Sequence, residues 1–448
     1  MYRCLAATDM QDRFVNLANG VAARLQPGEG FLARYAGEKS RFVRFNRAAI
    51  RQAGTVEQRY LALELFDGRR HASQTLSLTG NAEDEARIDA AISELREILA
   101  SAPEDPHFLV STSVQSTIRD APDRLPPDDA AVASILDNAA GADFVGFYAT
   151  GPVHHGFANS FGQRNWSTVH SFSLDACLYA QGDKAVKTAY AGAEWHDDAV
   201  QAKFAEAKAK LAILERPAKT IAPGEYRVFL APAAMEEVLG LLSWGGFSLA
   251  AHRTATTPLI RLARGEVALS PLVTLAENTG TGLAPGFQSE GFVKPDSVTL
   301  IESGQYKDCL ASPRAAKEFD TVHNAADSAE MPGSLDMAPG TLPDSEILSA
   351  LGTGLLIGNL WYLNYSDRNA CRLTGMTRFA SFWVENGNIV APVNVMRFDD
   401  SLYRMLGSNL IALTAAREYR LSTDTYERRS TASMRVPGAL IDGLRLTL

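Results

Sequence analysis

The sequence predicts an α+β protein, with a mixed α/β N-terminal region followed by a β-rich C-terminal domain that contains an antiparallel sheet. Helical and alternating apolar patterns are interleaved in the first half of the chain, whereas alternating runs dominate the second half. A chain of 448 residues is long enough for about two or three domains. The segment ERPAKTIAPG, residues 215–224, is the best linker because it combines prolines with polar residues. We therefore expect an α/β sub-domain at 1–120, a β-rich sub-domain with a closing helix at 121–220, and the C-terminal domain at 221–448.

The N-terminal region combines two helices with short strands. Apolar residues recur every three or four positions over residues 8–26, which predicts an amphipathic helix. Alternating runs then predict strands over Gly30–Glu38, Arg41–Arg47, Arg59–Phe66 and His71–Leu78. A second helix is expected next, because four apolar residues share one helical face: Ile88, Ile92, Leu95 and Leu99.

The central region reads as short strands between two helices. A short helix is expected over residues 130–139, and a longer one has Val200, Phe204 and Leu211 on one face. Between them lie four runs at hairpin spacing, which predict four short strands: DFVGFYATG, HHGFANSFG, STVHSFSLDACLYA and AVKTAYAGA.

The C-terminal half begins with the strand YRVFLAP and a helix. Pro232 is well placed to open that helix, and Gly245-Gly246 weakens its middle by roughly 1 kcal/mol per glycine. Residues 320–346 are poor in bulky apolar side chains, which predicts a long lid or tether that proteases cut first. Alternating runs predict five further strands: Leu272–Glu277, Ser297–Ser303, Gly354–Leu363, Thr377–Asn386 and Asn388–Phe398.

Composition and charge argue against several classes of protein. The net charge is −9 and no run of five basic residues occurs, which argues against direct nucleic-acid binding. Asp9 and Asp12 come too early for a secretory signal, and the apolar stretches are shorter than the ~18–20 residues of a membrane span. The four cysteines are scattered without a Cys-x-x-Cys pair, which is typical of reduced thiols. We therefore expect a cytoplasmic protein that binds neither nucleic acid nor membrane.

The histidines offer one candidate metal cluster. Neighbouring residues of a strand point to opposite faces, so His154 and His155 cannot serve one site without a bulge. Surface or core histidines are the alternative interpretation. The chain has no His-Glu-x-x-His or His-Glu-x-x-x-His motif, which a helical zinc peptidase uses to bring two imidazoles and a glutamate to one metal. The candidate cluster comprises four residues: His154, His155, His170 and His196.

Other catalytic patterns are equally sparse. A Gly-x-Ser-x-Gly elbow, a phosphate-binding Walker A loop and a dinucleotide-binding fingerprint are absent. Cys309 and Cys371 are candidate nucleophiles, with buried structural thiols as the alternative. The run WYLNY carries Trp361, Tyr362 and Tyr365, which form either sheet core or a peptide-binding groove. Composition and spacing alone therefore define no complete catalytic set.

Several stretches resemble the TldD/PmbA family of metallopeptidases. In the N-terminal region they are SRFVRFNRAAIRQAG, LALELFDGRRHASQT and APEDPHF. In the C-terminal half they are RGEVALSPLVTLAEN, FQSEGFVKPDSVTLIESGQYKDCLASPRAAKEF and the region from Leu351 to Met405, which is similar to the "TldD-related" version of the domain. The shared order and spacing of these stretches carry the resemblance.

The resemblance implies a member without its own zinc. Catalytic members carry His-Glu-x-x-x-His on a helix ahead of the SPLVTL strand, and the PmbA (TldE) side lacks this motif and pairs with a catalytic subunit. The corresponding segment here, GLLSWGGFSLAAH, places Ser243 and Ser248 at the histidine positions and Trp244 at the glutamate position. Serine is a poor zinc ligand, tryptophan cannot act as a base, and His252 alone does not hold a metal. We therefore expect no metal or cofactor in this chain and a zinc ion in a partner subunit.

The resemblance further implies a role in the proteolysis of small or unfolded peptides. The chain is expected to be the non-catalytic, TldE-like subunit of a heterodimer whose TldD-like subunit bears the zinc. The family also carries the name modulator of DNA gyrase. Two alternatives stay open: an autonomous hydrolase that uses Cys309 or Cys371 as its nucleophile, and a homodimeric peptide-binding protein without catalysis.

Overall fold

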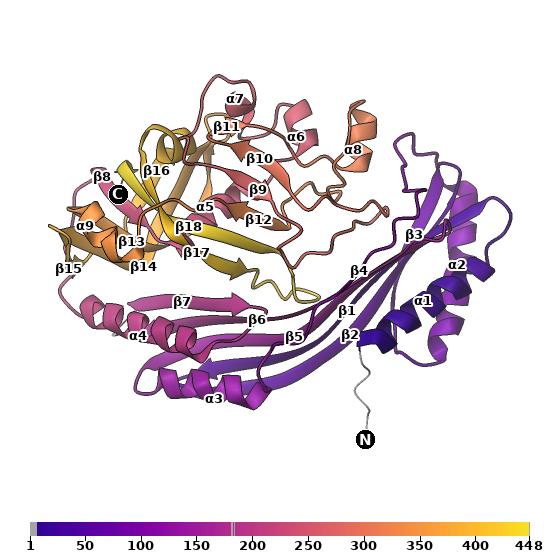
Figure 1. The fold of residues 1–448 in the computed structure, drawn as a ribbon, viewed down its shortest axis with the longest axis horizontal. Coiled ribbons are helices and arrows are strands. Elements are labelled where there is room, and N and C mark those ends of the chain that lie inside the picture. The colour runs from indigo at the N-terminus through magenta and orange to yellow at the C-terminus, as the bar shows by residue number, and fades with distance from the viewer. Residues whose placement is uncertain (1–6, 181, 183, 448) are drawn as a thin grey trace.

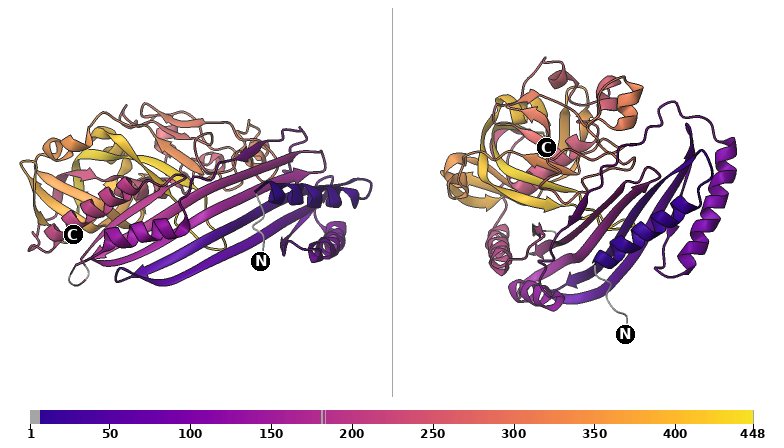
Figure 2. Two further views of the ribbon diagram at one scale, coloured as in Figure 1. Left: turned by 60° about the horizontal axis from the view of Figure 1, so that its bottom comes forward. Right: turned by 45° about the vertical axis from the view of Figure 1, so that its right-hand side comes forward.

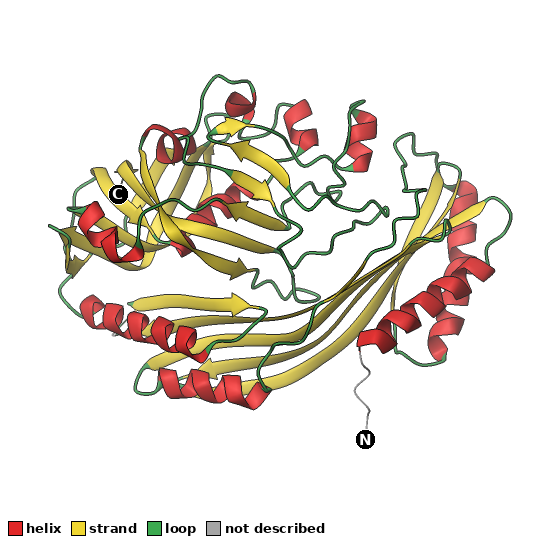
Figure 3. Ribbon diagram, in the orientation of Figure 1, coloured by secondary structure: helices red, strands yellow, loops and turns green. Residues whose placement is uncertain are grey.

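The computed structural model describes residues 7–180, 182 and 184–447, and it arranges them around two β-sheets. The N-terminal sheet is a long curved layer that extends beneath the more compact C-terminal half (Figure 1). Helices are distributed over both parts, mostly at the outside (Figure 3). The arrangement confirms the predicted α+β class. No helix in the described part of the chain has the length and apolar character to cross a membrane.

The N-terminal sheet has seven strands in the order β3-β2-β1-β5-β6-β4, with β7 also pairing with β6. All its pairings are antiparallel except that of β4 with β6. Segments from residues 29–77 and 143–192 thus share one sheet. Its strands are β1 (Glu29–Asn46), β2 (Ala49–Asp67), β3 (Arg70–Ser77), β4 (Ile118–Asp120), β5 (Asp143–Asn159), β6 (Arg164–Tyr179) and β7 (Ala185–Gly192).

Helices cover the outer face of this sheet (Figure 2), and the last of them, α4, also contacts the C-terminal half, where Lys203 pairs with Glu418. Because strand residues alternate between faces, Phe31, Ala33 and Tyr35 of β1 pack in one core with Phe14, whereas Arg34 points to the other face. The expected apolar face of α2 is buried as predicted. The four helices are α1 (Ala7–Ala23), α2 (Glu83–Ser101), α3 (Asp128–Ala139) and α4 (Asp197–Leu214).

Two pairs of predicted strands are single strands. Gly30–Glu38 and nearly all of Arg41–Arg47 lie within β1, and the run DFVGFYATG and the first six residues of HHGFANSFG lie within β5. The first of the two runs stops at Gly151, but Gly151 and Pro152 continue the strand in register with β6. Gly151 has a φ of 132°, and a Cβ there would lie 2.2 Å from the carbonyl oxygen of Lys39. This glycine therefore allows β1 and β5 to approach closely in mid-strand instead of forming a turn.

The second sheet has eleven strands and is mostly antiparallel, as predicted, with two parallel pairings, β12 with β18 and β8 with β13. Because β8 also pairs with β18, the strands β18, β16, β14, β13 and β8 form a closed ring. The predicted strand Asn388–Phe398 is divided between β15 and β16. The strands are β8 (Gly224–Leu230), β9 (Leu275–Glu277), β10 (Val298–Glu302), β11 (Gln305–Tyr306), β12 (Ser334–Met337), β13 (Gly354–Asp367), β14 (Arg372–Glu385), β15 (Asn388–Pro392), β16 (Arg397–Ser401), β17 (Leu410–Leu421) and β18 (Ser433–Leu446).

The expected lid or tether at residues 320–346 is wrong. Its middle forms β12, which lies between β9 and β18 in the sheet. Leu335 and Met337 are buried in the main core, and Glu330 just before the strand is also buried. A few buried residues therefore anchor this segment in spite of its low overall content of bulky side chains.

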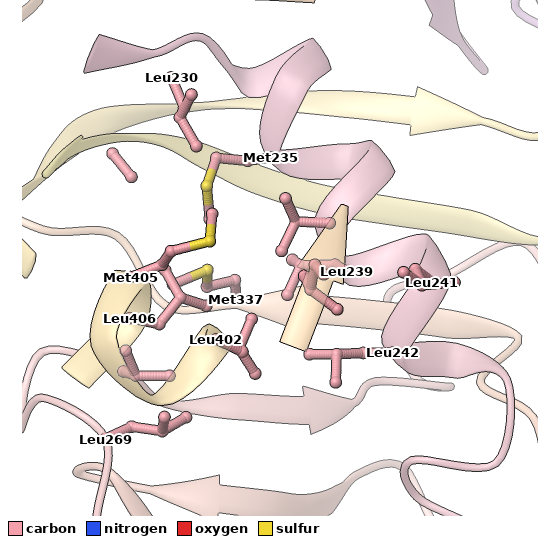
Figure 4. Packing of buried hydrophobic residues seen from close by; sticks show 14 of the residues in the cluster. Leu230, Met235, Leu239, Leu241, Leu242, Leu269, Met337, Leu402, Met405 and Leu406 are labelled. Atoms are coloured by element: carbon pink, nitrogen blue, oxygen red, sulfur yellow. The ribbon is translucent and has the colours of Figure 1, made fainter. Parts of the chain in front are cut away.

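The main core of the C-terminal half forms around α5. Met235 of α5, Met337 of β12 and Met405 lie close together in this core (Figure 4). The predicted linker 215–224 lies against the same half, because Lys219 N donates a hydrogen bond to Pro392 O at 2.8 Å. The helices of this half are α5 (Pro232–Ser243), α6 (Leu249–Arg253), α7 (Ile260–Ala263), α8 (Pro313–Glu318) and α9 (Ile347–Leu351), with a 3-10 turn at Asp344–Glu346 and a π turn at Arg404–Ser408.

Candidate functional site

A cleft between the two sheets contains the segment that resembles the zinc helix. Its cavity has a volume of about 470 Å³. One wall is formed by β6 and β7, and the other by α5, β17 and β18. Ser243 and Trp244 lie in the second wall. Because ligands bind preferentially in concave spaces between domains, this cleft is the candidate functional site.

The helix in this wall is shorter than the sequence predicts. It begins at Pro232 as expected, but it ends at Ser243, and α6 starts only at Leu249. Gly245 has a φ of 79°, a conformation that stops a right-handed helix. The prediction of one helix that continues through Gly245-Gly246 is therefore wrong.

Ser243 and Trp244 lie at the end of α5. The buried Ser243 Oγ donates a hydrogen bond to Leu239 O at 3.0 Å. The Trp244 side chain is 64% exposed, and its carbonyl accepts a hydrogen bond from Arg368 Nη2 at 2.8 Å. A hydroxyl bonded to its own helix and an exposed indole supply neither a good metal ligand nor a base.

Ser248 belongs to a different arrangement, centred on the buried carboxylate of Glu330. Glu330 Oε2 accepts hydrogen bonds from Ser248 Oγ at 2.6 Å and Ala250 N at 2.9 Å. Glu330 Oε1 accepts from Ser312 N at 2.8 Å and Ser312 Oγ at 2.9 Å. Because Ser248 and Ser312 cap α6 and α8, one carboxylate joins the N-termini of two helices. Sequence reasoning missed Glu330, since a single acidic residue in a polar segment is usually solvated.

The residues at the motif positions do not fit a zinc ion. His252 Nε2 lies 3.0 Å from Gly246 O, and its ring centroid lies 4.9 Å from that of Tyr306. Burial lowers the pKa of His252, so its imidazole is neutral and held by a backbone carbonyl. Within the described ranges, no three histidine, cysteine, aspartate or glutamate side chains gather as a metal site.

Most of the charged side chains that line the cleft form ion pairs, but one carboxylate does not. Arg420 Nε donates to Glu236 Oε2 at 2.6 Å, and Lys187 Nζ lies 3.2 Å from Asp175 Oδ2. The Glu237 side chain also lines the cleft and has no hydrogen-bond or ion-pair partner among the residues that the structure describes. Desolvation in the cleft and the neighbouring Glu236 raise the pKa of Glu237. The cleft thus offers an acidic group for a cationic part of a ligand.

One wall of the cleft presents the edge of a strand. Among the described strands, β7 pairs only with β6, so its second edge has unpaired backbone groups. The consecutive residues 189–191 of β7 all line the cavity, which indicates that the strand edge, and not a single face, borders it. A strand edge of this kind can pair with an extended peptide.

The three aromatic residues predicted for a peptide groove lie on β13, and the cleft is lined by other β13 residues, Asn359 and Leu363. Trp361 and Tyr362 are 48% and 76% exposed, and their ring centroids lie 5.8 Å apart. Tyr365 packs against the main core, and its hydroxyl donates to a backbone carbonyl of α5 at 3.1 Å. A peptide groove at these residues stays a prediction.

The two candidate nucleophilic cysteines are buried. Cys309 is 7% exposed and Cys371 is fully buried. Burial raises the pKa of both thiols, that of Cys371 to about 12. Because the thiolate is the nucleophile, neither cysteine has the environment of a reactive one.

We expect Cys309 and Cys371 to resist thiol reagents in the native protein. In a variant with Cys4→Ser and Cys177→Ser, a chromogenic disulfide reagent should titrate no thiol until denaturant is added, and then two. The physical reason is that both remaining thiols are protonated and shielded from solvent. Rapid stoichiometric labelling of the folded variant would instead support the alternative function, a hydrolase with Cys309 or Cys371 as its nucleophile.

The four candidate metal-binding histidines do not converge in the described structure. His154 Nδ1 lies 3.1 Å from Thr168 Oγ1, whereas His155 lines a cavity on the opposite face of the sheet. Burial lowers the pKa of both His154 and His155 to about 4. His170 lies 3.4 Å from a carboxylate of residue 123, and His196 precedes α4.

The C-terminal half of the chain matches a known protein family. The family model for the PmbA/TldA metallopeptidase C-terminal domain matches residues 223–448, half of the chain. The chain therefore belongs to the PmbA/TldA (TldD/PmbA) metallopeptidase family, which confirms the resemblance seen in the sequence. No curated protein matches the chain.

Solved structures share the whole fold. TldE from Thermococcus kodakarensis is 14% identical, with 97% of this chain and 100% of that chain covered and a TM-score of 0.78. A candidate modulator of DNA gyrase from Thermotoga maritima is 13% identical, with the same coverage and a TM-score of 0.77. A second one, from Bacteroides thetaiotaomicron, is 16% identical, with 98% and 99% coverage and a TM-score of 0.71. At these identities the likeness shows a common fold.

Proposed function

We propose that the chain is the non-catalytic, TldE-like subunit of a two-chain metallopeptidase that cleaves small or unfolded peptides. The observation that carries the proposal is the end of α5, where Ser243 and Trp244 border a cleft and, by the family resemblance, stand in place of a metal ligand and a base. Hydrolysis by this class of enzyme needs an activated water, so a zinc ion must come from a TldD-like partner. The scattered thiols and acidic charge support a cytoplasmic setting.

The proposed substrate is an extended peptide in the cleft. The free edge of β7 can supply backbone hydrogen bonds that do not depend on the sequence of the peptide. Trp244 adds an exposed aromatic surface, and Glu237 adds an unpaired carboxylate. Together these features favour unstructured peptides over folded proteins, because only an unfolded chain can present a free strand.

We expect peptidase activity only from a mixture of two chains. The purified chain should not hydrolyse an unstructured peptide, and it should gain activity with a His-Glu-x-x-x-His homologue from the same organism. Replacing the motif glutamate of the homologue should abolish the activity, because that residue acts on the zinc-bound water. Ser243→Ala in this chain should leave most of it, since Ser243 Oγ is bonded within its own helix. Chelator-resistant hydrolysis by the isolated chain would contradict the proposal, and binding of peptide without any activation would favour the homodimeric binder.

We expect Trp244→Ala to raise the KM of the two-chain enzyme by about tenfold, because a central aromatic contact with the peptide is lost. Tyr362→Ala is the matched control, since Tyr362 is also a largely exposed aromatic residue but lies outside the described lining of the cleft. Steady-state kinetics on one unstructured peptide would measure both variants. If only Tyr362→Ala raised the KM tenfold, the peptide would bind at the aromatic residues of β13 and not in the cleft.

A further inference from the structure

A second cavity lies between the inner face of the N-terminal sheet and loops of the C-terminal half. Its volume is about 590 Å³. The sheet contributes side chains from four neighbouring strands, which share one face because they are paired in register. The facing wall comes from loops around residues 285–289, 327 and 427–428. The size is that of a site for a small molecule.

Three polar side chains in its lining have no partner for at least one polar group. The imidazole of His155 and the guanidinium of Arg428 make no hydrogen bond or ion pair with any residue that the structure describes. Gln288 is only 3% exposed, and its Nε2 is buried without a hydrogen-bond partner. A buried polar group without a partner is costly, and of these residues Gln288 is the buried one. His155 is half-buried and Arg428 is exposed, so their donors are open to a ligand that accepts hydrogen bonds.

The charges around the cavity are balanced except at one place. Arg34 Nη2 pairs with Glu64 Oε2 at 2.6 Å, and Lys294 Nζ pairs with Asp327 Oδ2 at 2.6 Å. The adjacent residues Glu427 and Arg428 also line the cavity, and the described residues provide no partner for either side chain. One unpaired carboxylate and one unpaired guanidinium therefore border the same space.

The imidazole of His155 complements these charges without adding to them. Desolvation, together with Arg428, keeps the pKa of His155 at about 4, so the ring is neutral near pH 7. A neutral imidazole has one donor and one acceptor nitrogen. The lining also contains apolar side chains, with Phe157 and Phe287 both buried, and Tyr60.

We propose that this cavity binds a short peptide with free termini and an apolar side chain. The carboxylate of the ligand would face Arg428, its ammonium group would face Glu427, and the apolar side chain would contact Phe157 and Phe287. Both side chains are exposed to solvent, and a ligand with both charges can pair with both of them, whereas a purely anionic ligand would pair with Arg428 alone. The inference is independent of the function proposed for the cleft, because it rests on a different set of residues.

The test is calorimetric titration of the full chain with the dipeptide Ala-Phe and with its acetylated, amidated form. We expect saturable binding of Ala-Phe and an affinity at least about tenfold lower for the capped form, which lacks both charges. Equal affinity for the two compounds, or no saturable heat at millimolar Ala-Phe, would overturn the proposal.

Variants locate the binding. Arg428→Gln should weaken Ala-Phe binding by about tenfold or more, and Arg428 is exposed, so the variant should fold normally. Arg51→Gln is the matched control, since Arg51 is an exposed arginine on β2 outside the described lining. Trp244→Ala should leave the affinity unchanged. If Trp244→Ala abolished binding and Arg428→Gln did not, the dipeptide would occupy the cleft, and the second site would be refuted.

Discussion

Replacing Glu330 with alanine should lower the free energy of unfolding of the C-terminal half by about 3–5 kcal/mol. Glu330 is 2% exposed, and its two oxygens accept four hydrogen bonds. Without the carboxylate, the backbone N–H groups of Ala250 and Ser312 and two serine hydroxyls lose a buried acceptor. The N-termini of α6 and α8 then lose their shared anion, which also complements the helix dipoles. Unfolding in guanidinium chloride, followed by tryptophan fluorescence, would measure the change.

Two further variants make this test specific. Glu318→Ala removes an exposed carboxylate from α8 itself and should change stability by no more than about 0.5 kcal/mol. The loss of unfolding free energy for Glu330→Gln should lie between those for Glu318→Ala and Glu330→Ala. The amide keeps one acceptor oxygen but turns an NH2 group toward hydrogen-bond donors. A loss below about 1 kcal/mol for Glu330→Ala would mean that the serines cap their helices without it.

Local sequence patterns predict the helices of this protein better than the lengths of its strands. The apolar faces of α1, α2 and α4 and the start of α5 at Pro232 follow from local spacing, and the structure has them as expected. Strand lengths depend on neighbours that are distant in sequence. Gly151 ends a strand by its local signal, yet its lack of a side chain is what allows β1 to pass alongside β5. Such a role is visible only when the partner strand is known.

The candidate site was predictable only in part, for a related reason. The family resemblance placed Ser243, Trp244 and Ser248 in one segment, and two of these residues do border the cleft. The helix is interrupted at Gly245 because this residue has a left-handed φ. The helix propensity of glycine alone predicts a weakened helix and not an interrupted one. Glu330 is separated from Ser248 by 82 positions, so no local pattern joins them. Long-range polar contacts of this kind leave no periodic signal.

Replacing Arg429 with methionine should have a comparably large effect, at the contact between the two halves. Arg429 is 4% exposed and lies in the loop between β17 and β18, which reaches the N-terminal sheet. Its Nη2 donates to Ser171 O at 2.9 Å and Ser171 Oγ at 2.8 Å, and its Nη1 donates to Gly151 O at 3.1 Å. Its backbone N–H donates to Oε2 of the buried Glu38 at 3.3 Å. Burial lowers the pKa of Arg429 to about 10, so the side chain is still charged near pH 7.

Methionine retains the stem of the side chain but removes every donor of the guanidinium group. Two carbonyls then lose a partner, and the buried Glu38 carboxylate loses a favourable interaction with a buried cation, at an expected cost of about 3–5 kcal/mol. Because the loop is fixed to the sheet by this residue, limited proteolysis should cut between Thr423 and Arg428 much faster in the variant. Arg428→Met is the matched control, since its exposed side chain makes no such contacts and stability should change by about 0.5 kcal/mol at most. If the two neighbouring variants unfolded and were cut alike, the loop would be held by its backbone and not by Arg429.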